Sequence, residues 1–258
     1  PRNIGLVFSR ELKSYFSSLT VYIVIVMFLL MTGYFFYNLL ATFSVVSFQA
    51  QADPMLARQY QLLNINETVI RPLFGSISII LLIMTPLLTM RLFAEEKKTG
   101  TIELLLTFPV NDLDVVLGKY FACLAIQLIM ILMTATYPVL IVVLGEPEPM
   151  PILTGYLGLI LLGAAAISLG IFTSSVTENQ IVSASISFGI LFFFWLISYS
   201  VPLVSPGLGT LLGYLSINEH INSLSKGVID SEDIVYYLCF TVLFLFLTLR
   251  SLETNRWK

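Results

Sequence analysis

Six long runs of apolar residues constrain the fold of this chain more than any other feature of its sequence. A helix that crosses a bilayer needs about 20 mainly apolar residues. The sixth run is short unless it begins near Ser231, which could cap it with Asp230, and Pro86 and Pro138 are expected to kink the spans that contain them. The sequence therefore predicts an all-α polytopic membrane protein with six transmembrane helices, at residues 19–40, 72–90, 120–144, 152–172, 181–200 and 234–249.

The composition agrees with a membrane location and excludes several partners. Of the 258 residues, 57% are hydrophobic and only 11% are charged, whereas a soluble domain carries about 25% charged residues. The net charge of −3 offers no basic surface for a nucleic acid. Cys123 and Cys239 lie inside apolar runs, which favours packing roles over a disulfide.

The distribution of Lys and Arg residues predicts the orientation of the spans. If both termini lie on one side, that side holds ten basic residues and the other side holds three, namely Arg58, Arg71 and Lys226. Cytoplasmic loops carry the excess of Lys and Arg. We therefore expect both termini and the loop at 91–119 to be cytoplasmic. The basic residues on that side are Arg2, Arg10, Lys13, Arg91, Lys97, Lys98, Lys119, Arg250, Arg256 and Lys258.

Two segments outside the spans have patterns of their own. Residues 1–18 carry an apolar stripe at helical spacing, which predicts an amphipathic helix in the membrane interface; the alternative is an inward extension of the first span. Residues 201–233 are rich in Gly and Pro and predict a broken, re-entrant or surface helical hairpin, buried in protein if it enters the bilayer. A short helix follows there, with Ser216 and Glu219 as a capping box and Gly227 at its end. The single histidine, His220, is expected to lie at the surface or partly packed rather than to bind a metal.

Several functional classes lack their residues here. Away from their ends, the six predicted spans contain no Asp, Glu, Lys, Arg or His, which argues against a proton- or ion-driven carrier. The sequence has no HExxH, GxSxG or CxxC pattern. Its one Gly-Lys pair, Gly118–Lys119, lacks the upstream glycine and following Ser or Thr of a phosphate-binding loop. The chain is therefore expected to be neither an enzyme nor an ATP-binding protein.

The densest charge run, "RLFAEEKKTGTIELLLTFP" at 91–109, precedes an apolar segment too short to cross a membrane. Pairs of Arg91 with Glu95 and of Glu95 with Lys98 predict that the second span continues as a charged helix ending near Gly100. A second helix of about two turns is expected to begin at Thr101. Its faces carry Ile102, Leu104, Leu105, Leu106 and Phe108 and must be buried on the membrane surface or in a cleft of a soluble partner.

This region resembles the signature of ABC type-2 exporter permeases, roughly E-x-x-x-G-T-x-E-x-L-L-x-x-P-V followed by G-K. The spans and flanking segments also agree, so the resemblance covers essentially the whole chain. The stretch "EHINSLSKGVIDSEDIVYYL" is similar to the gliding-motility and copper-enzyme-maturation permeases. The matching positions are Glu96, Gly100, Thr101, Glu103, Leu105, Leu106, Pro109, Val110, Gly118 and Lys119.

The resemblance implies a single permease domain, 1–258, whose six-span bundle covers 19–250. It implies a homodimer, or a heterodimer with a related permease, joined to a cytoplasmic ATPase that binds ATP and magnesium. Residues 1–18 would be a connecting helix, the 173–180 loop a second contact through Glu178 and Asn179, and spans two and five the lining of the dimer interface and path. The residues implied in ATPase coupling are Glu96, Gly100, Thr101, Glu103, Leu105, Leu106 and Pro109.

A second hypothesis belongs to a different class. The long outer segments at 41–71 and 201–233 also suit a membrane anchor that passes ATPase motion to an extracytoplasmic partner and transports nothing. An intramembrane enzyme is disfavoured because no acid, base and nucleophile can be assembled. The weakly polar spans do not select among lipid, glycan, peptide and drug-like substrates.

Overall fold

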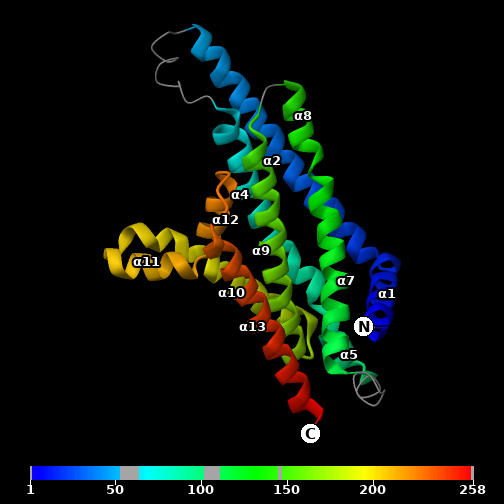
Figure 1. Cartoon of the computed structure of the whole chain (residues 1–258). Helices are drawn as coiled ribbons and strands as arrows, with labels where there is room; N and C mark the ends of the chain where they lie inside the picture. Colours follow the sequence, from blue (N-terminus) through cyan, green and yellow to red (C-terminus); the bar gives the residue numbers. More distant parts are fainter. Residues whose placement is uncertain (1, 53–63, 102–110, 145–146, 257–258) are drawn as a thin grey trace.

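The computed structural model describes residues 2–52, 64–101, 111–144 and 147–256, and every regular element in these ranges is a helix (Figure 1). The elements are α1 (Arg2–Ser17), α2 (Leu19–Ala52), η1 (Asn66–Ile70), α4 (Arg71–Thr89), α5 (Arg91–Lys98), α7 (Asp112–Met133), α8 (Thr136–Leu144), α9 (Pro149–Val176), α10 (Gln180–Ser200), η2 (Val201–Leu203), α11 (Pro206–Leu215), α12 (Ile217–Ser225) and α13 (Ser231–Arg256).

The six predicted membrane spans are confirmed as helices long and apolar enough to cross a bilayer. They cover Leu19–Gln49, Asn66–Lys98, Asp112–Val143, Pro149–Val176, Gln180–Leu203 and Ser231–Thr254. The sixth helix begins at Ser231, which removes the doubt about its length. The chain is therefore a multi-pass membrane protein.

The two prolines inside spans behave differently. The third span is divided into α7 and α8 at 134–135, four residues before Pro138, which cannot donate a backbone hydrogen bond to Thr134. The helix α4 instead passes through Pro86 and ends at Thr89. There the backbone N–H of Met90 still donates to the Pro86 carbonyl, at 2.9 Å. The kink at Pro86 stays a prediction.

The core of the bundle is formed by α4 and α9. In the most apolar stretch of each span, 67% of α4 and 61% of α9 is buried within the chain, against 28% of α2, 22% of α10 and 17% of α13. The glycines in "GAAAISLG" allow this close packing, as predicted from their size. A Cβ atom at Gly170 would overlap the side chain of Thr89 on α4, and one at Gly163 would overlap Gln127 on α7.

The N-terminal helix α1 is separate from the first span, because the helix is interrupted at Ser18 before α2 begins. It packs against α7, where a Cβ atom at Gly118 would overlap Val7. Tyr15 is fully buried, and its hydroxyl donates to the Leu88 carbonyl at 2.9 Å. The chain termini, α1 and α5 lie at the same end of the bundle in Figure 1. The interfacial location of α1 stays a prediction.

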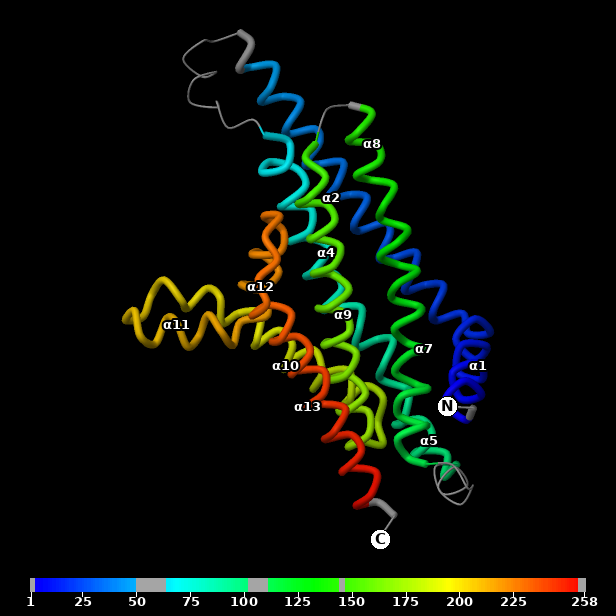
Figure 2. The backbone as a smooth tube through the Cα atoms, in the orientation of Figure 1, coloured from blue at the N-terminus to red at the C-terminus, as the bar shows by residue number. Residues whose placement is uncertain are grey.

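The segment after the fifth span forms η2, α11 and α12, and α11 projects sideways from the bundle (Figure 2). Gly209 is the only buried residue of α11, while Leu208 and Leu211 are exposed. The predicted break is therefore present, and the rest of the described chain leaves α11 mostly exposed. The re-entrant or surface hairpin stays a prediction. At the start of α12, one of the two hydrogen bonds of the predicted capping box is confirmed, because the Ser216 hydroxyl accepts from the Glu219 N–H at 3.4 Å. Beyond the end of α12, Gly227 has φ +90°, as expected of a residue that ends a helix.

Candidate functional site

The charged helix predicted after the second span is present as α5. It begins at Arg91, directly after Met90, and its last turn carries Lys97 and Lys98, which suit the negative end of the helix dipole. Gly100 follows with φ +70°, the left-handed conformation expected of a residue that ends a helix. The N–H of Thr99 donates to the Glu95 carbonyl at 3.0 Å. This end of the second span is therefore well defined up to the start of the apolar segment.

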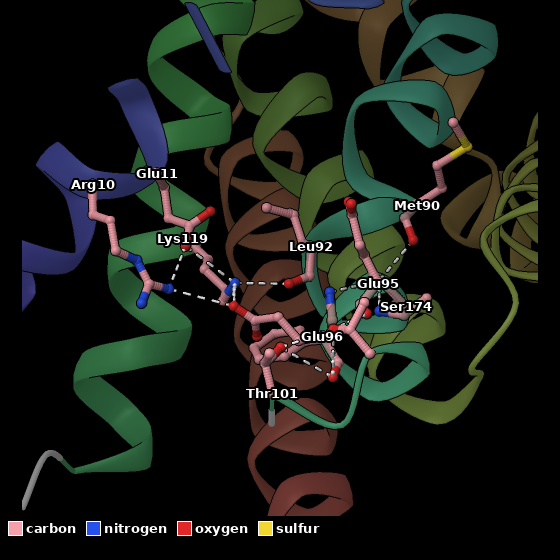
Figure 3. A network of polar contacts seen from close by, with 12 residues as sticks. Arg10, Glu11, Met90, Leu92, Glu95, Glu96, Thr101, Lys119 and Ser174 are labelled. Carbon is pink, nitrogen blue, oxygen red and sulfur yellow. Dashed lines mark hydrogen bonds and ion pairs between the residues drawn. The ribbon is translucent and has the colours of Figure 1, made fainter. Parts of the chain in front are cut away.

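A buried ion cluster joins α5 to two other helices. The Lys119 side chain is 1% exposed, and its ammonium group faces three acceptors (Figure 3). Nζ donates to the Leu92 carbonyl at 2.7 Å, to Glu96 Oε1 at 2.8 Å and to Glu11 Oε1 at 3.2 Å. An ammonium group has three N–H donors, so all of them are used. One residue of α7 thereby connects α5 to α1.

Arg10 closes this cluster on the solvent side. Its guanidinium donates to Glu11 Oε1 at 2.7 Å and to Glu96 Oε1 at 3.3 Å. Burial by itself would raise the pKa of Glu11, but the charge of Lys119 and the hydrogen bond from Arg10 outweigh it and leave that pKa below its ordinary value. Glu11 is therefore held ionised in the folded chain.

The junction of α4 and α5 is also fixed from the other side, by α9. Ser174 Oγ donates to the Met90 carbonyl at 3.0 Å and accepts from the N–H groups of Phe93 at 3.0 Å and Ala94 at 3.1 Å. The first N–H groups of a helix have no partner within that helix. One hydroxyl of α9 therefore satisfies two of these donors in α5.

The predicted pairing of Arg91 with Glu95 is wrong. Arg91 instead donates to Ser18 Oγ at 2.7 Å and lies over the Tyr15 ring, 4.9 Å from its centre. The local pair is worth a few tenths of a kcal/mol on a helix surface. The residues at the end of α1 offer Arg91 both a hydrogen bond and a cation–π contact, so the tertiary contact is formed.

The residues predicted to couple to an ATPase fall into two groups. Glu96, Gly100 and Thr101 lie together at the end of α5, where Thr101 Oγ1 donates to the Glu96 carbonyl at 3.3 Å. Glu103, Leu105, Leu106 and Pro109 lie outside the described residues. The next described residue is Asn111, which directly precedes α7 and whose side chain makes no capping hydrogen bond to that helix.

The second predicted contact is a shorter loop than expected. α9 continues to Val176 and α10 begins at Gln180, so the connection is 177–179 rather than 173–180. Glu178 and Asn179 are both exposed. Asn179 caps α10, because its side-chain oxygen accepts from the Ile181 N–H at 2.9 Å. Residues 173–176, which were expected in the loop, form the last turn of α9, where Ser174 and Ser175 are buried.

A cavity of about 470 Å³ separates α1 from α5 at this site. Its wall contains both the ion cluster and the Arg91 contacts. Within the described ranges, no group of three or more His, Cys, Asp and Glu side chains is placed to hold a metal ion. The arrangement is suited to holding helices together rather than to proton transfer, because the charges of the cluster are engaged with one another. The cavity is lined by Arg10, Glu11, Ser14, Tyr15, Ser17, Ser18, Arg91, Leu92, Glu95, Glu96 and Lys119.

Comparison with known proteins identifies the family of this chain. The family model described as "ABC-2 family transporter protein" matches residues 4–257, which is nearly the entire chain. A search of curated proteins finds no match.

Proposed function

The chain belongs to the ABC-2 transporter family, and we propose that it is the permease subunit that receives the motion of a separate cytoplasmic ATPase. In this proposal the ATPase binds ATP and magnesium, and this chain supplies the membrane path. The segment that follows Gly100, with Glu103, Leu105, Leu106 and Pro109, seats in a cleft of the ATPase. Both termini lie on the same side as the ATPase, in a bacterial plasma or inner membrane.

The buried Lys119 cluster is the observation that carries this proposal. The segment 101–110 connects α5 to α7, and Lys119 of α7 binds the Leu92 carbonyl and Glu96 of α5. The two helices that flank the segment are therefore fastened to each other and, through Glu11, to α1. A push on the segment would move α4, α7 and α1 together, which suits a coupling helix supported by a connecting helix.

A second contact would lie beside the first. The 177–179 loop, with Glu178 and Asn179, follows α9, and Ser174 of α9 binds the start of α5. Both cytoplasmic segments are thus attached to the same buried helix. We propose that the ATPase contacts both, with the larger share of the interface on 100–109.

The permease is proposed to act as a dimer, either of this chain or with a closely related one. The second span is mostly covered within the chain, although Ile83 and Leu87 remain 37% exposed. The fifth span is more open, with Phe193 63% exposed. The exposed surface of α10 therefore supplies more of the proposed interface and path than that of α4.

The test replaces Leu105 and Leu106 with Asp in the full chain, co-expressed with the ABC ATPase proposed as its partner. A charge buried without a partner is heavily penalised, so we expect the double variant to insert normally but to lose ATPase binding and stimulation. Leu113→Asp is the matched control, because Leu113 is 50% exposed just beyond the segment. Binding and stimulation of the double variant at the level of the control would contradict the proposed docking.

The anchor hypothesis is supported by the length of α2. Its 34 residues rise about 1.5 Å each, or about 51 Å, whereas the hydrocarbon core of a bilayer is about 30 Å thick. A helix of this length and the projecting α11 suit contact with a protein outside the membrane. A continuous path between protomers, or transport by reconstituted complexes, would favour the permease; ATP hydrolysis that moves only an outer partner would favour the anchor.

A further inference from the structure

The single histidine of the chain lies in a buried polar cluster. Its helix, α12, lies between the fifth and the sixth span, whereas α5 ends the second, so the two are at opposite ends of the spans. His220 of α12 is 5% exposed, so the expected surface or partly packed position is wrong. Nδ1 is 2.6 Å from Asp233 Oδ1 on α13, and Nε2 is 3.2 Å from the Tyr214 carbonyl on α11. The ring stacks on Tyr236, with the ring centres 4.1 Å apart. One side chain thus connects three helices.

The two oxygens around the ring determine how many protons the cluster holds. A carbonyl oxygen only accepts, so Nε2 must carry a proton to bind Tyr214. The short contact between Nδ1 and Asp233 needs a second proton, on either atom. With one proton fewer, a lone pair of the ring would face either the Tyr214 carbonyl or the Asp233 carboxylate. The observed contacts therefore require both protons, whether the pair is imidazolium with carboxylate or imidazole with carboxylic acid.

We propose that His220 and Asp233 form a proton-binding site that fastens α11 to the bundle. When the cluster loses one proton, the shorter contact to Asp233 is kept and the longer contact to the Tyr214 carbonyl is lost. The end of α11 then keeps the hydrogen bond from the Tyr236 hydroxyl to the Leu215 carbonyl, at 2.9 Å. α11 is consequently firm at low pH and looser at high pH. The inference does not depend on transport or on an ATPase.

The surroundings suit reversible protonation. A cavity of about 500 Å³ adjoins the cluster and gives it access from outside the bundle. Negative groups on its wall stabilise an added positive charge, and the described wall contains no Lys or Arg. Asp233 Oδ2 is buried and has no partner among the described residues, so this carboxylate relies on His220. The titratable groups around the ring are Tyr214, Glu219, Asp230, Glu232, Asp233, Tyr236 and Tyr237.

The contact at the end of α11 matters because this helix has few others. Apart from its neighbours η2, α10 and α12, α11 projects away from the bundle (Figure 2). Its exposed side chains include Leu208, Leu211 and Tyr214. A proton bound at His220 therefore controls the position of an apolar helix through one backbone carbonyl. Histidine is the residue that ordinarily changes its charge between about pH 5 and 8.

The test uses the full chain in lipid nanodiscs with isotope-labelled histidine. Because the chain has one histidine, the ring nitrogens give one set of NMR signals. At low pH, we expect the chemical shifts of the two ring nitrogens to match the state in which the His220–Asp233 cluster holds two protons. As the pH rises, we expect a single transition to the state with one proton. Amide exchange at 206–215 is expected to accelerate about tenfold or more across the same transition, as expected for the loss of a hydrogen bond to a charged group.

Two variants make the interpretation specific. Asp233→Asn removes the carboxylate and is expected to move the histidine transition to lower pH. Tyr236→Phe removes the second contact of α11, and is expected to loosen 206–215 at every pH while leaving both protonation states of the ring observable. Ring-nitrogen signals that show no transition between about pH 5 and 8 in the wild-type chain, or exchange at 206–215 that is independent of the histidine transition, would overturn the proposal.

Discussion

The two ends of the bundle use similar contacts with different chemistry. At the α5 end, the Lys119 ammonium meets the Leu92 carbonyl and the carboxylates of Glu96 and Glu11. At the far end, the His220 ring meets the Tyr214 carbonyl and the Asp233 carboxylate. The first connection is made by an ammonium group that donates to three acceptors. The second, in our proposal, depends on a proton held between His220 and Asp233.

This difference agrees with the two proposals. A segment that transmits force from an ATPase needs a permanent attachment, and Lys119 holds three helices around it. The projecting α11 has no such attachment in the described chain, and its position is adjustable by one proton. Between the two ends lies the packing of α4 on α9, and α9 contacts both α5 and α12.

The largest expected effect comes from Lys119→Met, which breaks the cluster at the α5 end. It leaves Glu11, Glu96 and the Leu92 carbonyl without their shared donor. Removing one partner of a buried ion pair costs about 3–5 kcal/mol, so we expect a loss of this order in the free energy of unfolding. Denaturant titration of the purified chain in detergent measures it, and protease cleavage within α1 reports whether that helix detaches.

Lys13→Met is the matched control for this variant. Lys13 is an exposed lysine on α1, and surface substitutions usually change stability by less than about 0.5 kcal/mol. Equal stability of Lys119→Met and Lys13→Met would show that the cluster does not hold the α5 end together. The Lys119 cluster could then no longer be regarded as a permanent attachment, and its contrast with the His220 cluster would fail.

A smaller effect is expected from Gly170→Ala, which tests the connection between the ends. The added methyl group would overlap the Thr89 side chain, and overpacking of this kind costs about 1–3 kcal/mol. Gly189→Ala on α10 is the control, because nothing lies within 4 Å of the added atom. In that position the better helix propensity of alanine should raise stability by up to about 1 kcal/mol. Thermal unfolding of both variants measures the difference, and a change of the same sign in both would contradict the close packing of α4 on α9.

The sequence predicts the local parts of this picture and misses the contacts between distant segments. The spans, the end of α5 at Gly100 and the cap at Ser216 depend on residues within a few positions of each other. The bond between Lys119 and Glu11 joins residues 108 positions apart, and no local pattern specifies it. The sequence pairs Arg91 with Glu95 for the same reason, because its pattern shows only local partners, whereas Ser18 and Tyr15 are far away in sequence.

The burial of His220 illustrates the same limit. A polar stretch outside the spans suggests exposure, since nothing nearby in sequence covers the ring. The cover comes from α13, where Tyr236 stacks on the ring and Asp233 binds it. One signal was available, because Asp233 and Tyr236 lie three residues apart and share one helical face. Their joint use of His220 still required the position of α12.

The smallest effect separates the two ends by the sign of their pH dependence. Glu11 has a pKa below its ordinary value, so its contribution to stability is fully present above that ordinary value, near pH 4.3. It is lost as the pH falls further, through the folded-state pKa.

Between about pH 5 and 8, we therefore expect α1 to keep the same amide-exchange protection while that of α11 falls with rising pH. Below about pH 4, α1 should lose protection, and Glu11→Gln should remove this acid-dependent part. Glu253→Gln is the control, because Glu253 pairs with Arg250 at the exposed end of α13 and should leave α1 unchanged. Protection of α1 that falls with rising pH, in parallel with α11, would show that the two ends respond to the same proton and that the contrast between them is wrong.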